Sequence, residues 1–264
     1  VIRLCNRATE IDPDYAQAWA LMALGKFRIS EGRTGDTGFA AAERALALDP
    51  NLAEAHAVKA RILAENDDHA EAQAEIATAL RLAPDSYDVN RAAGYLAFRQ
   101  RRRDDAIHYY EKALSLGEMD INSAAMLMTC YSSAGDLEKT NASARIVLSR
   151  AEKVLGHDHN NGTAIGYSAY ALCALGQVDR AKERMTRALL IEPENWSMVY
   201  NFACTLVAAE DHNGALDMLE PSFAMFPPGL VKHAKVDPDF DPIRDNPRFK
   251  ALLAKAEARL AGNA

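Results

Sequence analysis

The chain has 264 residues, of which 49% are hydrophobic and 25% are charged, and its formal net charge is −7. This composition predicts a soluble, folded protein, and the acidic balance argues against a general affinity for nucleic acid or for anionic membrane surfaces. No stretch approaches 18 uninterrupted apolar residues, so no membrane span is predicted in this segment. Alanine, the strongest helix former, accounts for 50 residues, which favours an all-α fold.

The chain begins inside a helical pattern, "VIRLCNRATEID", without an initiator methionine and without a signal peptide. We therefore expect a fragment of a longer polypeptide. Residues 1–15 have the pattern of the second helix of a repeat whose first helix is missing.

Three later stretches share one ending, A-L-x-[LI]-x-P, followed by a polar residue and a new helical pattern: "AERALALDPNLAEAHA", "IATALRLAPDSYDVNR" and "MTRALLIEPENWSMVY". Pro50 and Pro84 lie 34 residues apart, and so do Pro193 and Pro227. A 34-residue period with this ending resembles the tetratricopeptide repeat, a helix–turn–helix unit. The resemblance implies an all-α superhelical solenoid of antiparallel helix pairs, in which stacking of neighbours supplies the core.

The repeat pattern predicts six full units, at 16–52, 53–86, 87–120, 121–161, 162–195 and 196–229. The first has three extra residues around "GRTGDTG", and the fourth has seven, between a lengthened second helix and "GHDHNNG". In this family three positions per repeat need small side chains, and alanine fills 12 of the 18 such positions here. Composition alone would place alanine at about three of them, so the alignment is not a product of alanine richness.

Residues 230–264 are predicted to form capping helices. The segment "DPDFDPIRDNPRFKALL" raises the question of a calcium loop, but an EF-hand needs glycine at its sixth position and glutamate at its twelfth, where this chain has Pro242 and Arg248. We interpret it as a polar terminal cap, with Asp245 or Asn246 as the helix N-cap and Pro247 in the first turn. It resembles the end of tetratricopeptide arrays in bacterial adenylate/guanylate cyclases and winged-helix transcriptional regulators, through Asp237-Pro238, Asp241-Pro242, Arg244, Pro247, Arg248-Phe249 and Leu252-Leu253.

No motif predicts a catalytic site, a cofactor or a metal site. His157-Asp158-His159 has no further ligands to complete a metal shell and is interpreted as a solvated loop. The arginine run at 99–103 suits a phosphate or an acidic partner, or else a solvated turn neutralised by Asp104 and Asp105. The four cysteines lack CxxC spacing and lie in helical patterns, which indicates core thiols in a reducing compartment.

The resemblance also implies which residues face the concave groove. The N-terminal half of the groove then carries arginines among aromatic residues, which suit carboxylates and extended peptides. Alternatively, these side chains are merely solvated or pack on one another. The C-terminal half, near Tyr170 and Tyr200, is expected to be roomy. The predicted binding residues are Phe27, Arg28, Arg61, Arg91, Tyr95, Phe98, Arg99 and Asn122.

The carboxylate clamp of some chaperone-binding relatives needs lysine at position 5 and asparagine at position 9 of one repeat. Ala20 and Leu24, then Ala57 and Arg61, occupy those positions here, so that clamp is absent.

We predict a non-catalytic protein-interaction module without a cofactor that binds a peptide or partner helix. The closing motif implies the regulatory C-terminal region of a bacterial cyclase or transcriptional regulator, acting in signal transduction. Two alternatives remain, a homo-oligomerisation scaffold that docks through residues 1–15 and a small-ligand sensor in the roomy half of the groove. A cytoplasmic location is expected, or a periplasmic one if the parent protein has an upstream membrane helix.

Overall fold

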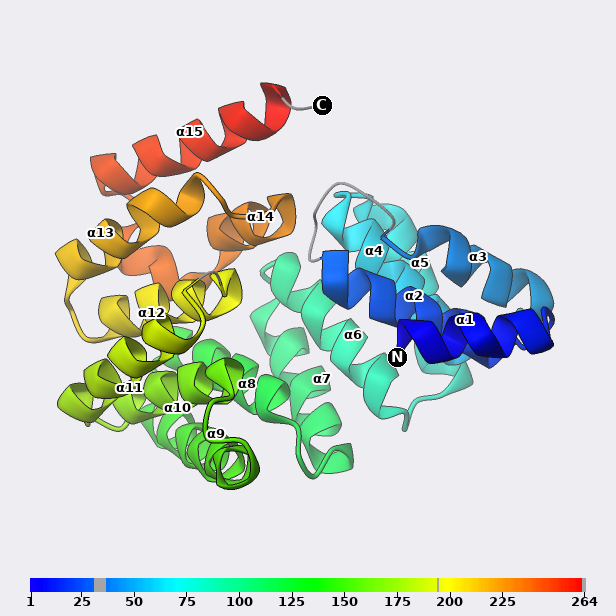
Figure 1. Cartoon of the computed structure of the whole chain (residues 1–264), viewed down its shortest axis with the longest axis horizontal. Helices are drawn as coiled ribbons and strands as arrows, with labels where there is room; N and C mark the ends of the chain where they lie inside the picture. The colour runs from blue at the N-terminus through cyan, green and yellow to red at the C-terminus, as the bar shows by residue number, and fades with distance from the viewer. Residues whose placement is uncertain (31–36, 194, 263–264) are drawn as a thin grey trace. The chain divides into compact units, whose positions relative to one another are not determined.

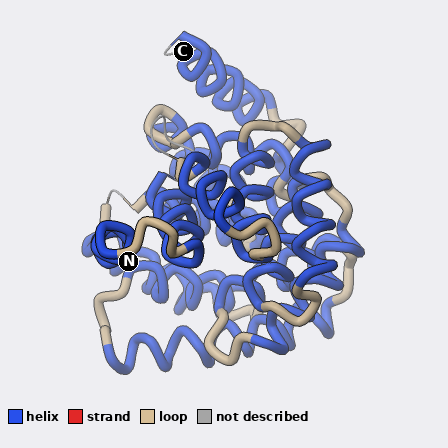
Figure 2. The backbone as a smooth tube through the Cα atoms, turned by 90° about the vertical axis from the view of Figure 1, so that its right-hand side faces the viewer, coloured by secondary structure: helices blue, strands red, loops and turns tan. Residues whose placement is uncertain are grey.

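The computed structural model describes residues 1–30, 37–193 and 195–262. Throughout these residues the chain forms α-helices and one 3-10 helix, joined by short loops and without any strand (Figure 2). The predicted all-α class is therefore confirmed. The chain divides into two compact units: unit 1 comprises residues 1–117 and 227–232, and unit 2 comprises residues 118–226 and 233–264.

Unit 1 is built mainly from seven helices in which each helix contacts its sequence neighbour, and α2, α4 and α6 also contact one another in order (Figure 1). Its core is lined by small and branched side chains, among them Ala60, Ile76 and Leu96. The helices are α1 (Ile2–Ile11), α2 (Ala16–Ser30), α3 (Phe39–Leu48), α4 (Ala53–Glu65), α5 (His69–Leu82), α6 (Tyr87–Arg99) and α7 (Arg103–Leu116).

Unit 2 continues the paired arrangement and ends in a different way. Its helices are α8 (Ile121–Ser133), α9 (Leu137–His157), α10 (Gly162–Ala174), α11 (Val178–Ile191), α12 (Trp196–Ala208), α13 (His212–Phe223), the end of α14 (Pro228–Val236), the 3-10 helix η1 (Pro238–Ile243) and α15 (Pro247–Gly262). In the part of the chain that is described, no helix combines the length and the apolar character that crossing a bilayer requires.

Polar caps define where several helices of unit 2 begin. The side chains of Asp120, Asp136, Asn161, Asn195 and Asp211 each accept a hydrogen bond from a backbone N–H in the first turn of the helix that follows. Those N–H groups have no partner within the helix, so such caps stabilise the helix start by about 1 kcal/mol each.

Close helix approach explains the small residues of the repeat pattern. On α6, a Cβ added to Gly94 would lie 2.9 Å from the ring of Tyr110 on α7, which is 1% exposed. Only glycine lets these two helices pack at this distance without moving the ring. The side chains of Ala60, Ala79, Ala113 and Ala188 are likewise fully buried.

Of the two predicted insertions, one lies within the described residues and the other falls largely outside them. The helix predicted to be lengthened corresponds to α9, which has 21 residues where α5, α7 and α11 have 14 each. The insertion around residues 32–38 falls largely on residues 32–36, which lie outside the described residues.

The closing segment forms a cap. Asn246 accepts a hydrogen bond of 2.8 Å from the backbone N–H of Arg248, so it is the N-cap of α15, and Pro247 occupies the first turn as predicted. The aromatic rings of Phe240 and Phe249 lie 5.4 Å apart, and Phe249 also meets Phe223 of α13 at 6.1 Å. Because both Phe240 and Phe249 are fully buried, the cap shares its apolar core with the preceding helices of unit 2.

Candidate functional site

The clearest candidate site in unit 1 is centred on Arg61 of α4. Its guanidinium carbon lies 4.7 Å from the centre of the Phe27 ring on α2 and 5.0 Å from that of the Tyr95 ring on α6. Three successive first helices thus each supply one member of a stacked cation–aromatic group. Stacking of this kind holds an arginine in one orientation while its edge stays available for hydrogen bonding.

Arg61 sits in an electropositive setting. Burial and the neighbouring charge of Arg91 lower the pKa of Arg61 to about 10, so the guanidinium remains charged at neutral pH. Its buried Nε has no hydrogen-bond partner among the described residues. A buried donor without a partner is costly, and a carboxylate placed there would satisfy both the donor and the charge.

The acidic side chain of Glu65, four residues after Arg61 on α4, is engaged by other groups. It accepts a hydrogen bond from the hydroxyl of Tyr95 and lies 3.8 Å from the guanidinium of Arg99. Burial, together with the Glu65 carboxylate, raises the pKa of Tyr95, which keeps that hydroxyl protonated as the donor. Arg99 also lies 3.6 Å from Asp67 and is 6% exposed. These contacts hold the Tyr95 side chain in its position against Arg61.

A pocket of about 150 Å³ adjoins Arg61. Its lining combines apolar groups with Arg61 and a few other polar side chains: Gln17, Ala20, Leu21, Leu24, Leu52, Glu54, Ala57, Val58, Asp88 and Ala92. Most of these stand at groove positions of the repeat pattern. Leu21, Leu52, Val58 and Ala92 do not, and only their packing in the folded unit shows that they complete the pocket.

The remaining predicted site residues are distributed as follows. Arg28 is exposed on α2, and the guanidinium carbon of Arg91 lies 5.8 Å from the Tyr87 ring. Phe98 is 4% exposed and packs in the core with Arg99, so neither presents an open surface. Asn122 belongs to unit 2, where its side-chain amide donates a hydrogen bond of 3.0 Å to the hydroxyl of Tyr167.

The arginine run at 99–103 forms a turn that is largely paired with acidic and amide groups. Arg102 forms an ion pair with Asp105 and hydrogen bonds to Gln100 and Gln73. Arg103 lies 3.5 Å from Asp104. The structure therefore supports the interpretation of this run as a neutralised turn and not as a free basic patch.

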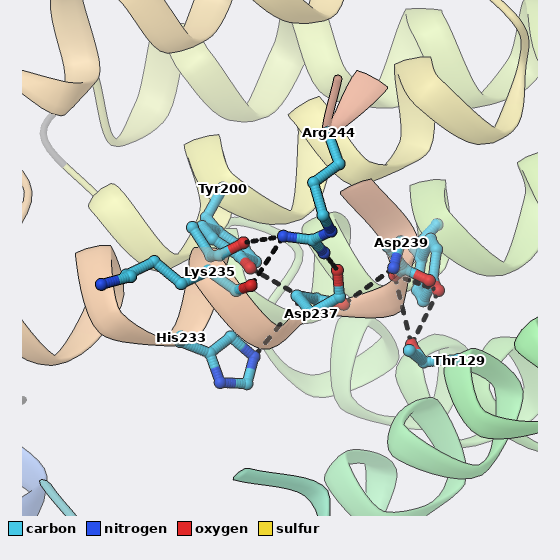
Figure 3. Close-up of polar contacts among 9 residues, drawn as sticks. Thr129, Tyr200, His233, Lys235, Asp237, Asp239 and Arg244 are labelled. Atoms are coloured by element: carbon cyan, nitrogen blue, oxygen red, sulfur yellow. Dashed lines mark hydrogen bonds and ion pairs between the residues drawn. The ribbon is translucent and has the colours of Figure 1, made fainter. Parts of the chain in front are cut away.

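A second polar cluster lies in unit 2, around the two aspartates at the start of η1 (Figure 3). Asp237 accepts a hydrogen bond of 2.6 Å from the hydroxyl of Tyr200 and lies 3.4 Å from Nε2 of His233. Asp239 accepts hydrogen bonds from the hydroxyls of Tyr170, at 2.6 Å, and Thr129, at 3.2 Å. The segment is thereby tied to α8, α10 and α12.

The two carboxylates titrate in opposite directions. Burial opposes the ionisation of Asp237, but hydrogen bonds from His233 and Tyr200 outweigh it and lower the pKa of Asp237. Burial and the adjacent charge of Asp237 raise the pKa of Asp239 to about 8. At neutral pH the pair therefore holds one proton, as two buried carboxylates close to each other generally do.

The thiol of Cys204 completes a possible ligand group, because its sulfur and one oxygen of each carboxylate lie within 4.8 Å of one another. Burial raises the pKa of this thiol well above its usual range, so it stays protonated. Both carboxylates are already engaged by hydroxyl donors. These hydroxyl donors, together with the one proton that the two carboxylates hold at neutral pH, stabilise the arrangement.

The expectation of a roomy C-terminal groove is wrong. Tyr170 and Tyr200, predicted to border open space, are 8% and 3% exposed because η1 covers them. The chain's own closing segment occupies the face that its first helices were expected to leave open. Cys173 and Cys204, on neighbouring helices, are both free thiols, and Cys173 donates a hydrogen bond of 3.2 Å to the carbonyl of Thr205.

Comparisons with known proteins agree with the paired helical architecture of the described residues. Residues 53–86 match the family described as the tetratricopeptide repeat. A stretch of 107 residues is 34% identical to the Hsp70/Hsp90 co-chaperone cns1 of Schizosaccharomyces pombe; it covers 40% of this chain and spans 28% of that protein.

Two solved structures show a similar fold. The APC/C hetero-tetramer Cut9–Hcn1 is similar over 97% of this chain and 45% of the other, with a TM-score of 0.61 and 15% identity. Pseudomonas aeruginosa PilF is similar over 83% of this chain and 95% of the other, with a TM-score of 0.51 and 17% identity. The repeat match and these likenesses together establish that the chain has the tetratricopeptide-repeat solenoid fold.

Proposed function

We propose that this protein is a non-catalytic interaction module, and that unit 1 binds an extended acidic segment of a protein partner. In this proposal a carboxylate of the partner pairs with Arg61, and a neighbouring apolar side chain enters the adjoining pocket. The observation that carries the proposal is the charged guanidinium of the half-buried Arg61, whose buried Nε has no partner among the described residues and which lies between Phe27 and Tyr95 beside that pocket.

The dimensions of the pocket and the positive charge around Arg61 support this ligand class, whereas Glu54 and Asp88, which also line the pocket, carry negative charge. A volume of about 150 Å³ accepts a side chain the size of leucine or methionine, and Leu24, Leu52 and Val58 offer it apolar contacts. Arg28 and Arg91 add positive charge to the field at Arg61. Since the aromatic rings already hold Arg61 in place, little side-chain entropy is lost when a carboxylate binds.

The test uses a labelled decapeptide with one leucine flanked by glutamates, and a second peptide in which every glutamate is replaced by glutamine. We expect the glutamate peptide to bind more tightly, and the double variant Arg61→Gln/Arg91→Gln to weaken its binding at least about tenfold, because charge-assisted hydrogen bonds contribute ~1.5–3 kcal/mol each.

The matched control is Arg44→Gln, which removes one positive charge from an exposed position on α3. It should leave the affinity of the glutamate peptide unchanged. Equal affinity of the wild type and the Arg61→Gln/Arg91→Gln variant, with both folded by circular dichroism, would rule out the proposed site. Equal loss in Arg44→Gln would show that only net charge matters.

The closing segment supports a further part of the proposal, namely a parent protein that is a bacterial adenylate/guanylate cyclase or a winged-helix transcriptional regulator. Residues 237–253 resemble the end of the tetratricopeptide arrays in those proteins. Four free, buried cysteines support a cytoplasmic location. Sequencing the gene upstream of the codon for Val1 tests this directly, and a reading frame without a catalytic or DNA-binding domain would overturn the parentage.

Homo-oligomerisation through α1 is a second candidate, favoured by one observation. Val1, Leu4 and Ile11 are 70%, 69% and 73% exposed, so α1 leaves an apolar face uncovered in this chain. If a second copy covers it, light scattering should give a dimer mass for the wild type and a monomer mass for Leu4→Glu/Ile11→Glu. A monomer mass for the wild type at high concentration would dismiss this candidate.

A further inference from the structure

A cleft of about 460 Å³ in unit 2 has no role in the interaction proposed for unit 1. It lies where the last turns of α9 meet the start of α10 and one face of α11. Leu155 and Ile165 supply apolar wall, Gly156 leaves room beside them, and three arginines stand along α11, at 180, 184 and 187. Residues spaced by four and three positions share one face of a helix, so the three guanidinium groups reach the same space.

The bonds made within the cleft leave positive charge there. Arg184 is neutralised by Glu152, with 2.5 Å between Nη2 and Oε1, and it also donates a hydrogen bond of 2.8 Å to Ser168. Arg180 and Arg187 instead donate to neutral acceptors, the amide oxygen of Gln177 at 2.5 Å and the carbonyl of His159 at 3.0 Å.

Glu183 is the second acidic residue of the lining, so three arginines face two glutamates. This excess of positive charge stands out on a chain whose formal net charge is −7. An anionic group that enters the cleft meets two arginines, Arg180 and Arg187, that it can engage without first breaking an ion pair.

The lengthened α9 builds one wall of this cleft. With the usual 14 residues the helix would end near residue 150, before Glu152, Leu155 and Gly156. A Cβ added to Gly156 would meet nothing within 4 Å, so this side of the last turn of α9 borders open space. The insertion thus adds a wall to the cleft.

We propose that this cleft binds a phosphorylated small molecule of about nucleotide size. Its phosphates are held by Arg180 and Arg187, and its apolar or ring portion lies against Leu155 and Ile165. The planar guanidinium fork matches phosphate oxygens in pairs, and 460 Å³ falls within the range typical of small-molecule sites. The site lies in unit 2, so its failure would leave the peptide site of unit 1 untouched.

The experiment titrates the whole chain by calorimetry with ADP, pyrophosphate and adenosine separately, at low salt. We expect ADP to bind, pyrophosphate to bind more weakly, and adenosine to give no measurable heat. The double variant Arg180→Gln/Arg187→Gln should lower the affinity for ADP at least about tenfold, since two charge-assisted contacts are lost.

The control is Arg145→Gln, which makes the same kind of charge change at an exposed position on α9 outside the cleft. It should bind ADP as the wild type does. Absence of ADP binding to the wild type, unchanged ADP affinity in the folded double variant, or an equal loss in Arg145→Gln would each overturn the proposal. Pyrophosphate binding as tight as that of ADP would overturn the contact assigned to Leu155 and Ile165.

Discussion

The hydroxyl of Tyr170 donates a hydrogen bond of 2.6 Å to Asp239, a residue 69 positions further along the chain. With Thr129, which bonds the same carboxylate, it anchors the closing segment to two earlier helices of unit 2. Because the pKa of Asp239 is raised to about 8, this anchor makes the stability of unit 2 depend on pH.

Asp239→Asn tests that dependence. In the wild type the pKa of Asp239 in the folded chain lies above its ordinary value of 3.8, so the folded state binds the extra proton between those two values. This contribution to the free energy of unfolding is complete below pH 4 and is lost as the pH rises through 8. Asparagine keeps an acceptor for Tyr170 but cannot ionise, so the variant should lose less stability than the wild type between pH 5 and 8.

Urea denaturation at pH 5, 6.5 and 8 measures the effect. The two proteins should differ little at pH 5, and Asp239→Asn should be the more stable at pH 8. Parallel pH profiles for the two proteins would contradict the assignment. Asp179→Asn, at an exposed position on α11, serves as the control and should keep the wild-type profile.

Two glycine substitutions should have opposite effects. In Gly94→Ala the new methyl group would lie 2.9 Å from the buried ring of Tyr110, and we expect a loss of about 1–2 kcal/mol in the free energy of unfolding. In Gly156→Ala the methyl group meets open space, and the higher helix propensity of alanine should stabilise the protein by about 0.5 kcal/mol. Thermal unfolding of both variants measures this, and equal shifts would refute the close approach at Gly94.

Substitutions of two arginines in the closing segment, Arg244 and Arg248, should differ in their effect on stability. Arg244 donates to the carbonyls of Lys235, at 2.6 Å, and Asp237, at 2.5 Å (Figure 3). Arg244→Met leaves these carbonyls without their donor and should cost about 2–3 kcal/mol. Arg248 forms only exposed ion pairs, so Arg248→Met should leave the denaturation midpoint near that of the wild type. A midpoint for Arg244→Met equal to that for Arg248→Met would contradict this reasoning.

Lys59 holds three glutamates together in unit 1. Its ammonium lies 2.6 Å from Glu43, 2.8 Å from Glu75 and 3.3 Å from Glu71, and its side chain is 12% exposed. Lys59→Met leaves these carboxylates to repel one another, so it should lower the free energy of unfolding at pH 7 by about 1–3 kcal/mol.

This loss should shrink in acid. Burial opposes ionisation of Glu75, but bonds from His56 and Lys59 outweigh it, so its pKa lies below the ordinary value of 4.5. Its contribution to stability is therefore present above pH 4.5 and disappears as the pH falls through the folded-state pKa. Urea denaturation of both proteins at pH 7 and pH 3 measures the difference, and a gap that stays constant would contradict the cluster's electrostatic origin.

Much of the fold could be predicted from the sequence, because the features that specify it act within one helix pair or between adjacent pairs. Apolar spacing of three and four residues, prolines at 34-residue intervals and small residues at helix contacts all act between near neighbours in the stack. The same kind of local pattern predicts a lengthened helix, found as α9, and an N-cap at Asp245 or Asn246, of which Asn246 is the one observed. The contact of Arg61 with Tyr95 follows from placing position 9 of successive repeats side by side, whereas Phe27 stands at position 12 of its repeat.

What the sequence did not reveal depends on contacts across long stretches of chain. Asp237 and Asp239 have the pattern of solvent-exposed turn residues. Hydrogen bonds from residues far away in sequence, among them Tyr170 and Tyr200, compensate for their burial. The bond from Thr129 to Asp239 joins residues 110 positions apart. The arginines along α11 likewise look like an ordinary exposed helix face until the end of α9 is placed opposite them.

The docking of η1 has a consequence for any ligand of unit 2. The segment is covalently tethered to the helices it covers, so it competes for them at an effective concentration on the order of millimolar. A partner that approaches α8, α10 and α12 from this side must bind more tightly than the tether does, or must first displace it. The closing segment would therefore disfavour weakly binding partners at this face and admit only those that bind more tightly than it does.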